Sequence, residues 1–564
     1  MGYAHDYAAA IMRRGRVPMP PADFVPDWAD GPRKTKFYPG ADTVPLPGHT
    51  VPSGATVGRG LAPAHDGPER AFDLPTLSGM LRDSYGLTGR RLGVQANTDL
   101  GALPFHPLAN WSRGTASGGG LYPVSIYWVS GPSGPLPPGV HYYATRHHAM
   151  QRLLTGDVSG EVREAAGEPE PTASGEPAEP GEFAGSASSA VSGGPAATGE
   201  PASAAERAAE TDQFLVLGVK YWQNAFKYNS FSFHAVTMDV GTVVQTWRIW
   251  ARAQGLSVEP LMWFDEQRLA RLLGIRTEEE GVFAVVPLRW RGAGARPAPP
   301  AAAAAVRRRD LERSRTVLAF DAVTRMQEAT EAHAARRPAA GALAPAAAPV
   351  PDSGLLAVPL PAPLPLDADV RTALRDRRSS FGRFDAGRPL SAELLASCLA
   401  AAAAGASLGG DTGTGTTPIV GLYAFVGHTE GIAPGAYSYD AAAHTLRLLK
   451  AGPPGTFLQK NYFLANYNLE QTGAVLVPTV RTRAVLDAVG DRGYRIANAV
   501  VGAVSQSVYT AASALGVGCG VALGFDNISY IEELDLERTG EAPLLIMMLG
   551  NERPGPADFR HEIA

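Results

Sequence analysis

The sequence predicts an α+β protein in which one domain, made of helices and antiparallel sheet, occurs twice. Three kinds of pattern recur in the same order in the two halves of the chain: a β-hairpin, a long apolar helix and a closing apolar strand. One such match can arise by chance, whereas three in the same order favour a duplicated domain. Two copies of one fold can pair as the subunits of a two-fold homodimer do, so we expect an intramolecular pseudo-dimer.

The helix is the clearest repeated element. The pattern Gly241-x3-Gln245-x9-Gly255 is matched by Gly502-x3-Gln506-x9-Gly516. Each pattern spans an apolar segment of helical length and ends at a glycine that suits a helix C-cap. Upstream, residues 139–154 and 435–449 share a layout of short apolar runs around a turn, which predicts a β-hairpin in each half. Each half then closes with an apolar strand, at residues 282–288 and 544–549.

Two stretches of biased composition interrupt the repeats. Residues 167–205 are acidic and almost free of large apolar side chains, which predicts a disordered insertion. Residues 293–363 have Pro/Ala-rich ends, but residues 306–336 lack Pro and Gly and carry an apolar stripe typical of a helix: Leu311, Val317, Leu318, Phe320, Val323 and Met326. We therefore expect an N-terminal domain at 1–292, a linker with one helix at 293–363 and a C-terminal domain at 364–564.

Composition argues against several classes of protein. The 564 residues include 50 Lys and Arg against 55 Asp and Glu, a balance that gives no support for nucleic-acid binding. No apolar run approaches the roughly 20 residues that cross a bilayer, and we see no signal peptide. Two cysteines, Cys398 and Cys519, cannot build a disulfide framework, and no His-x3-His or Cys-x2-Cys spacing predicts a metal site. We expect a cytoplasmic protein without a metal.

Two motifs of the N-terminal half can carry chemistry. Ser117-Gly118-Gly119-Gly120-Leu121-Tyr122-Pro123 precedes the strand predicted at 124–129. Glycines let the backbone approach a ligand closely, although three of them can also form a simple flexible turn. Lys227 and Tyr228 stand shortly before the long helix, among aromatic residues that can line a pocket or belong to the core. Taken alone, a Lys-Tyr pair is most often a surface feature.

The C-terminal half offers groups suited to an anion. Arg377-Arg378-Ser379-Ser380-Phe381-Gly382-Arg383 precedes a helix predicted at 392–404. Guanidinium forks and a hydroxyl suit a phosphate monoester, although the segment alone can be a solvated basic turn. The glycine-rich stretch 516–524 can bring backbone amides to a flat ring or be an ordinary helix-to-strand turn. Arg553 follows the last strand.

Together these motifs resemble the FMN-dependent azoline dehydrogenases of the nitroreductase superfamily, of the SagB type, in a tandem-domain form. The resemblance implies two nitroreductase-like domains and one kind of cofactor, FMN. It implies a phosphate grip formed by Arg377, Arg378, Ser379, Arg383 and Arg553. Gly520 and Val521 would lie along the flavin ring edge, and Ser117, Gly118 and Gly119 would belong to a covering loop from the other domain. Two departures are Ala116, where the family loop has proline, and one extra residue between Arg377 and Phe384, which leaves the role of Arg383 open.

The two halves carry complementary parts of such a site. The N-terminal half has the covering loop and the Lys-Tyr pair, but its segment at 58–77 lacks an Arg-Arg-Ser motif. The C-terminal half keeps that motif, but its loop at 414–418 lacks the Ser-Gly pattern and no Lys-Tyr pair precedes Tyr494. We therefore expect one composite flavin site in the pseudo-dimer instead of two.

The resemblance also implies a reaction, the oxidation of thiazolines and oxazolines in a ribosomal precursor peptide, beside the cyclodehydratase that forms the rings. Lys227 and Tyr228 would be the catalytic pair, one of them removing a proton while the flavin takes a hydride. Lysine and tyrosine titrate near ~10, so the base needs a lowered pKa, and the sequence leaves open which residue it is. Reoxidation by dioxygen is expected because no dinucleotide fingerprint is present.

Two other functions stay open at this point. One is an NAD(P)H-dependent flavin reductase of nitro compounds, quinones or dehydroamino acids, although such a reductase needs no strong base. The other is a flavin-free scaffold within a peptide-modifying complex, which the loss of motifs from each half would suit. Likeness of fold cannot choose among the three.

Overall fold

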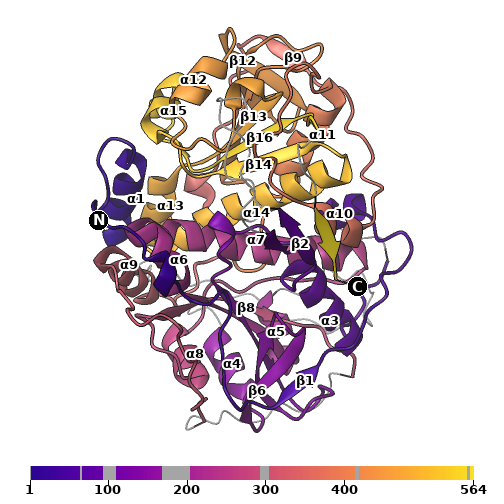
Figure 1. Ribbon diagram of the computed structural model, residues 1–564, viewed down its shortest axis with the longest axis vertical. Helices are drawn as coiled ribbons and strands as arrows, with labels where there is room; N and C mark the ends of the chain where they lie inside the picture. The colour runs from indigo at the N-terminus through magenta and orange to yellow at the C-terminus, as the bar shows by residue number, and fades with distance from the viewer. Residues whose placement is uncertain are drawn as a thin grey trace, which may run out of the picture.

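A computed structural model describes residues 2–63, 67–92, 109–167, 204–292, 304–412, 418–554 and 559–563. The two halves of the chain form two domains, which Figure 1 shows one above the other with the long helices α7 and α14 along their boundary. Each domain combines one antiparallel sheet with helices, so the predicted α+β class and the tandem arrangement are confirmed.

The N-terminal sheet has six strands in the order β1-β6-β5-β4-β7-β8. The C-terminal sheet repeats this order as β9-β12-β11-β10-β13-β16 and adds β14 beyond β16, with β15 paired to β13. Neighbouring strands are antiparallel in both sheets. The strands are β1 (Thr43–Pro45), β4 (Val124–Ser130), β5 (Gly139–Ala144), β6 (Ala149–Thr155), β7 (Gln213–Lys220), β8 (Glu280–Pro287), β9 (Ala357–Pro359), β10 (Val420–Val426), β11 (Gly435–Asp440), β12 (Thr445–Ala451), β13 (Ala474–Val480), β14 (Gly518–Ala522), β15 (Ala542–Pro543) and β16 (Ile546–Gly550).

A third, small sheet links the ends of the chain. It consists of β2 (Gly89–Leu92), β3 (Ala109–Ser112) and β17 (Arg560–Glu562), in the order β17-β2-β3. Because β17 comes from the end of the chain and β2 and β3 from its first quarter, this sheet ties the two domains together.

The helices repeat less completely than the strands. The predicted helix at 392–404 is α11, with those bounds, and the long helix before Gly255 begins at Ser232, nine residues before Gly241. Gly255 and Gly516 have φ of +74° and +69°, as a glycine C-cap requires. The helices are α1 (Tyr3–Arg13), α2 (Val57–Leu61), α3 (Leu74–Ser84), α4 (Ser159–Ala166), α5 (Ala204–Glu210), α6 (Trp222–Tyr228), α7 (Ser232–Ala253), α8 (Glu266–Leu273), α9 (Asp321–Glu331), α10 (Val370–Asp376), α11 (Ala392–Ala404), α12 (Gly455–Lys460), α13 (Thr482–Val489), α14 (Gly493–Ala514) and α15 (Asn527–Glu533).

The helices α7 and α14 pack directly against each other at the centre of the molecule. A Cβ atom on Gly241 would collide with the carbonyl oxygen of Ala499, and one on Gly502 would collide with that of Met238. The absence of side chains at these two equivalent positions is therefore what lets the helices cross so closely. One hydrophobic core runs through both domains around this crossing.

The linker differs from the prediction. Its helix α9 covers only residues 321–331, whereas the apolar stripe predicted a helix within 306–336. The preceding residues are irregular because polar contacts hold them against the N-terminal domain: Lys220 pairs with Asp310 and Glu312, and the Asp30 carboxylate accepts from two backbone amides, those of residues 315 and 316. Leu311, Val317 and Leu318 are consequently exposed, while Val323 and Met326 are buried. Almost all of the insertion predicted at 167–205 lies outside the described residues.

Candidate active site

The structure brings the glycine loop and the Lys-Tyr pair together. Lys227 and Tyr228 are the last residues of α6, which ends because Asn229 adopts a φ of +41°. In the loop, Gly119 has a φ of +63°, and a Cβ atom there would overlap the Tyr228 hydroxyl and lie 2.9 Å from Lys227 Nζ. The Lys227 ammonium also lies 4.9 Å from the centre of the Tyr228 ring. Two motifs that lie about a hundred residues apart in the sequence therefore meet at Gly119, which has no side chain.

A buried carboxylate holds the start of this loop. Ser117 Oγ donates to Asp239 Oδ2 at 2.6 Å, and the Gly118 amide donates to Asp239 Oδ1 at 2.8 Å. Burial raises the pKa of Asp239 to about 7, against the opposing effect of these two hydrogen bonds. No role for Asp239 was predicted from the sequence, although Asp239 stands in the same turn of α7 as Gly241, a residue of the repeat.

Lys34 is a second residue that the sequence did not assign. Its Nζ donates to the Gly120 carbonyl at 3.0 Å, from the irregular segment that precedes β1. Burial of the ammonium lowers the pKa of Lys34, and the positive charges of Arg113 and Lys227 lower it further. Two ammonium groups, those of Lys34 and Lys227, therefore lie near this loop.

The Arg-Arg-Ser segment lies beside the end of the last strand of the C-terminal domain. Phe384 pairs with Glu552 in an antiparallel bridge, and the Arg553 amide donates to the Arg383 carbonyl at 2.9 Å. Arg378 forms a two-pronged ion pair with the Glu552 carboxylate, one of its contacts at 2.8 Å. Arg378, Arg383 and Arg553, predicted from separate motifs, are thus neighbours in the fold.

Arg377 points in another direction. Its Nε donates to the Gly114 carbonyl at 2.8 Å and its Nη2 to the Arg113 carbonyl at 3.0 Å, both just before the glycine loop of the other domain. Gln506 of α14 adds contacts to the same stretch, accepting from the Ala116 amide at 3.0 Å. The C-terminal domain therefore clamps the covering loop onto itself, a role for Arg377 that the sequence did not predict.

Aromatic side chains fill the space around the predicted ring edge. Gly520 lies in β14 against Tyr467, whose ring a Cβ on Gly520 would approach to 2.5 Å. Val521 follows Gly520 in the strand, opposite Met547. Ser379 Oγ lies 2.9 Å from the Tyr509 hydroxyl. Tyr467 therefore lies against β14, and Tyr509 lies against Ser379 of the Arg-Arg-Ser segment.

Tyr462 lies near both this aromatic group and Tyr228 of the Lys-Tyr pair. Burial raises the pKa of Tyr462, and the nearby phenols of Tyr228 and Tyr509 raise it further. Tyr228 belongs to the N-terminal domain and Tyr509 to the C-terminal domain, so parts of both domains face one region. Cys519, in the same strand, is buried, and burial raises the pKa of its thiol, which favours a packing role over a nucleophilic one.

Two nitrogen atoms of Arg113, Nε and Nη1, are buried and have no hydrogen-bond partner within the described part of the chain. An unsatisfied buried donor costs free energy unless water or a ligand meets it. Together with the arginine group, these Arg113 nitrogens are donors suited to an anion.

The pseudo-symmetric counterpart of the Lys-Tyr pair has apolar residues. The 261-residue offset between Gly241 and Gly502 places Ala488 and Val489, at the end of α13, where Lys227 and Tyr228 end α6. Beside them, Arg492 and Arg495 both bind the buried Glu266, with Nη1 to Oε2 distances of 2.8 and 3.0 Å. Neither residue at the counterpart positions can act as a base.

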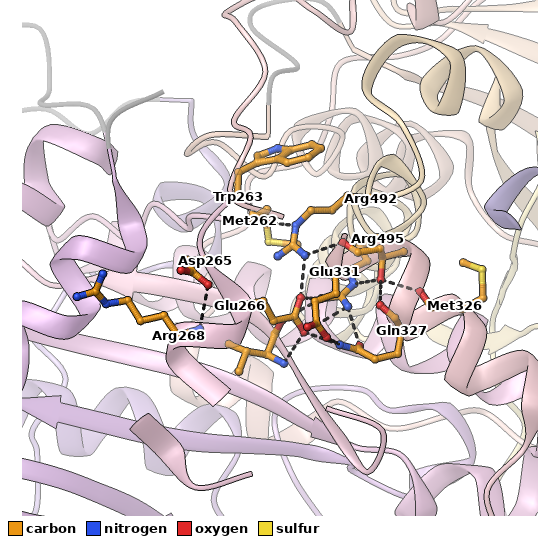
Figure 2. A network of polar contacts seen from close by, with 12 residues as sticks. Met262, Trp263, Asp265, Glu266, Arg268, Met326, Gln327, Glu331, Arg492 and Arg495 are labelled. Carbon is orange, nitrogen blue, oxygen red and sulfur yellow. Dashed lines mark hydrogen bonds and ion pairs between the residues drawn. The ribbon is translucent and has the colours of Figure 1, made fainter. Parts of the chain in front are cut away.

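The linker helix adds Gln327 to this ion network, as Figure 2 shows. Gln327 of α9 accepts from Arg495 Nη2 at 2.8 Å and donates to Glu266 Oε1 at 2.9 Å. Burial alone would raise the pKa of Glu266, but the two arginines outweigh it and hold the pKa below its usual value. A buried ion network therefore follows the counterpart of the Lys-Tyr pair along the chain.

A comparison with protein families finds a match, which lies in the C-terminal half. Residues 374–551 match the model of the Nitroreductase family. This half contains a nitroreductase-family domain. A solved structure from Anabaena variabilis ATCC 29413, described as a nitroreductase, aligns over 98% of this chain and 100% of its own, with a TM-score of 0.67 and 19% identity. That match shows that the fold of the whole tandem chain is shared.

Two further solved structures match smaller parts of the nitroreductase-fold chain. One is a Ralstonia eutropha JMP134 protein described as a nitroreductase (TM-score 0.29, 20% identity, 37% of this chain and 95% of that one). The other is an Escherichia coli microcin synthetase complex with a truncated precursor bound (TM-score 0.27, 19% identity, 32% of this chain and 70% of that one). Their TM-scores are too low to support an argument. No curated protein sequence matches this chain.

Neither a metal site nor a membrane span is found in the described ranges. Their His, Cys, Asp and Glu side chains form no group of three or more that could hold a metal ion. Of the helices described, none has both the length and the apolar character to cross a bilayer.

Proposed function

We propose that this chain is an FMN-dependent oxidoreductase that converts thiazolines and oxazolines of a ribosomal peptide to thiazoles and oxazoles. The observation that carries the proposal is the position of Lys227 and Tyr228 against Gly119, in a loop that Arg377 clamps to the C-terminal domain. An oxidoreductase of this fold that only transfers hydride does not need two proton-accepting side chains at that point.

The residues present fit FMN. Arg378, Arg383, Arg553 and Ser379 would hold the phosphate, with Arg378 shared between the phosphate and Glu552. Arg377 would contribute through its clamp on the loop and, as the family resemblance implies, at the edge of the phosphate. Gly520 and Val521 would lie along the ring, with Ser117, Gly118 and Gly119 covering it. When bound, FMN supplies the acceptor for the hydride, and dioxygen would reoxidise it.

The protein's own contribution is proton removal and positioning. Aromatisation of an azoline removes a proton from the Cα carbon and a hydride from the adjacent ring carbon. Lys227 Nζ and the Tyr228 hydroxyl reach the same point beside Gly119, so either can take the Cα proton from a ring placed there. Asp239 keeps the loop, and therefore the ring, in register through Ser117 and Gly118.

The direct test uses purified, FMN-loaded protein and a synthetic peptide that contains a thiazoline. We expect loss of two hydrogen atoms per ring by mass spectrometry, with hydrogen peroxide formed in equal amount. Lys227→Ala and Tyr228→Phe should each reduce turnover by about a hundredfold or more while FMN content is kept. Arg276→Gln, at a side chain that is 66% exposed, is the control.

The other outcomes separate the remaining functions. Rapid bleaching of the flavin by NAD(P)H, with no azoline oxidation, would replace the proposal with a reductase. A protein that takes up no FMN but binds the peptide or a cyclodehydratase would point to a scaffold. We further propose that the natural partners are a modified precursor peptide and the cyclodehydratase that forms its rings, since azolines must be made before they are oxidised.

A further inference from the structure

A cavity of about 240 Å³ lies beside the candidate active site in the N-terminal domain. It is formed by the segment around Lys34 and by the turn between β5 and β6. Its polar lining includes Arg33, Lys36, Thr145, Arg146, His147 and Gln151, and none of the described residues that line it is acidic. Its chemistry therefore suits an anion.

Lys36 does not supply the free positive charge of this cavity. Its ammonium is buried, forms an ion pair with Glu280, and lies 2.5 Å from the Tyr127 hydroxyl. Arg152, on the neighbouring strand, is paired with Asp42. The excess charge at the cavity thus comes from the two guanidinium groups of Arg33 and Arg146.

Two polar atoms at the cavity lack partners among the residues described. Thr145 is only 4% exposed, yet its Oγ1 is buried without a hydrogen bond, and so is Arg33 Nε. The Arg33 guanidinium is held over the Phe37 ring, 5.2 Å from its centre. A buried hydroxyl and a pre-positioned guanidinium, both unsatisfied, are the donors that a carboxylate accepts from.

The cavity is close to the catalytic loop. Lys34 contacts Gly120, and Lys36 lies two residues further on, at most about 7 Å along the chain. The β5–β6 turn is at the end of the sheet where β4 begins, because β4 and β5 are antiparallel with Tyr127 opposite Tyr142. The loop that contains Gly119 leads directly into that end of β4.

We propose that this cavity binds a carboxylate of the peptide that is being oxidised, an acidic side chain within about three residues of the azoline ring. Arg33 and Arg146 would neutralise the carboxylate and Thr145 would donate to it. The inference rests on the proposed function, because it takes a peptide as the substrate. It adds a sequence preference that the catalytic residues alone would not give.

The test compares short amidated peptides that carry one thiazoline and differ at one position, glutamate against glutamine, scanned over three positions on either side of the ring. Dissociation constants from calorimetry with FMN-loaded protein do not require turnover. At one position we expect glutamate to bind about tenfold more tightly, with a matching fall in KM. That preference should disappear in Arg33→Gln and weaken in Thr145→Val, and it should persist in Arg276→Gln.

Each outcome decides something different. No glutamate preference at any position, or a preference unchanged in both Arg33→Gln and Arg146→Gln, overturns the cavity proposal. The glutamine peptides are also measured with a free C-terminal acid, and tighter binding of these alone would assign the site to the peptide terminus and overturn the side-chain proposal. Tighter binding of glutamate that depends on Arg33, without oxidation of any peptide, keeps the cavity site and contradicts the proposed reaction.

Discussion

Gly241 of α7 and Gly502 of α14 occupy equivalent positions of the two halves, and each faces a backbone carbonyl of the other helix. The carbonyls belong to Ala499 and Met238. The relationship is reciprocal, as in a two-fold interface. It fixes how closely the two domains approach and therefore where the covering loop of one meets the arginine segment of the other.

Substitution of either glycine by alanine should destabilise the protein. Replacing glycine by alanine inside a helix normally stabilises the helix by about 1 kcal/mol. Here we expect the opposite effect on stability. We expect Gly241→Ala and Gly502→Ala each to lower the free energy of unfolding by about 1–3 kcal/mol, because the new methyl group meets a backbone carbonyl that cannot move freely. Urea denaturation measures this. Gly48→Ala, where a Cβ would meet nothing within 4 Å, is the control, and a stabilised Gly241→Ala would contradict the close crossing.

The glycine loop allows a matched comparison. Gly119 and Gly120 have similar positive φ values, +63° and +65°, so alanine strains the backbone similarly at both. Only at position 119 would the methyl group meet Lys227 and Tyr228, because a Cβ at position 120 meets nothing within 4 Å. We expect Gly119→Ala to reduce azoline oxidation at least about tenfold more than Gly120→Ala, with similar thermal stability. Equal activity in the two variants would show that Lys227 and Tyr228 do not belong to the active site.

Asp239 should give the stability a characteristic pH dependence. Its pKa is raised to about 7 by burial, from an ordinary 3.8, so the folded protein keeps a proton that the unfolded chain releases in this window. The free energy of unfolding should therefore fall, through this group, as the pH rises from about 4 to about 7. Asp239→Asn removes that contribution, so the variant should gain stability relative to the native protein between about pH 5 and about pH 8.

Urea denaturation of the flavin-free protein across that pH range tests the assignment. Asp535→Asn, at a side chain that is 69% exposed, should leave the native pH dependence intact. The assignment fails if Asp239→Asn runs parallel to the native protein over the whole range.

Glu266 should be essential for stability and irrelevant to flavin binding. Glu266→Gln leaves the buried Arg492 and Arg495 without their carboxylate, and loss of one partner from a buried ion network costs about 3–5 kcal/mol. Glu279→Gln, in an exposed pair with Arg276, should cost at most about 1 kcal/mol. At a temperature where Glu266→Gln is folded, its FMN content per chain should equal that of the native protein. A lower FMN content per chain in Glu266→Gln than in the native protein would mean that the network belongs to the flavin site.

Local patterns were sufficient for much of the fold. The repeated helix around Gly241 and Gly502, the two hairpins and the helix at 392–404 follow from periodicity, turn residues and capping, which act over a few residues. The linker helix was predicted too long because the stripe from Leu311 to Phe320 is apolar in sequence but is held in irregular form by ion pairs with Lys220. Those partners lie about ninety residues away, so no local pattern reveals them.

In the candidate site, too, local motifs were predicted from the sequence and contacts between distant residues were not. Lys227, Tyr228 and the arginine segment carry recognisable motifs, whereas Asp239, Lys34 and Gln506 act through backbone groups of a distant loop. Arg377 was predicted from a motif, but its clamp on the Gly114 carbonyl depends on how two domains pair. A single carboxylate or lysine has no sequence signal for such a contact, and only the fold supplies its partner.

The amount of flavin per chain tests the central claim, one composite site shared by two domains, most directly. The purified protein is saturated with FMN, freed of excess, and its released flavin is measured against polypeptide. We expect about one FMN per chain, lost in Ser379→Ala combined with Arg378→Ala and retained in Glu266→Gln. Two FMN per chain, or one FMN that survives loss of Arg378 and Ser379, would contradict the composite site.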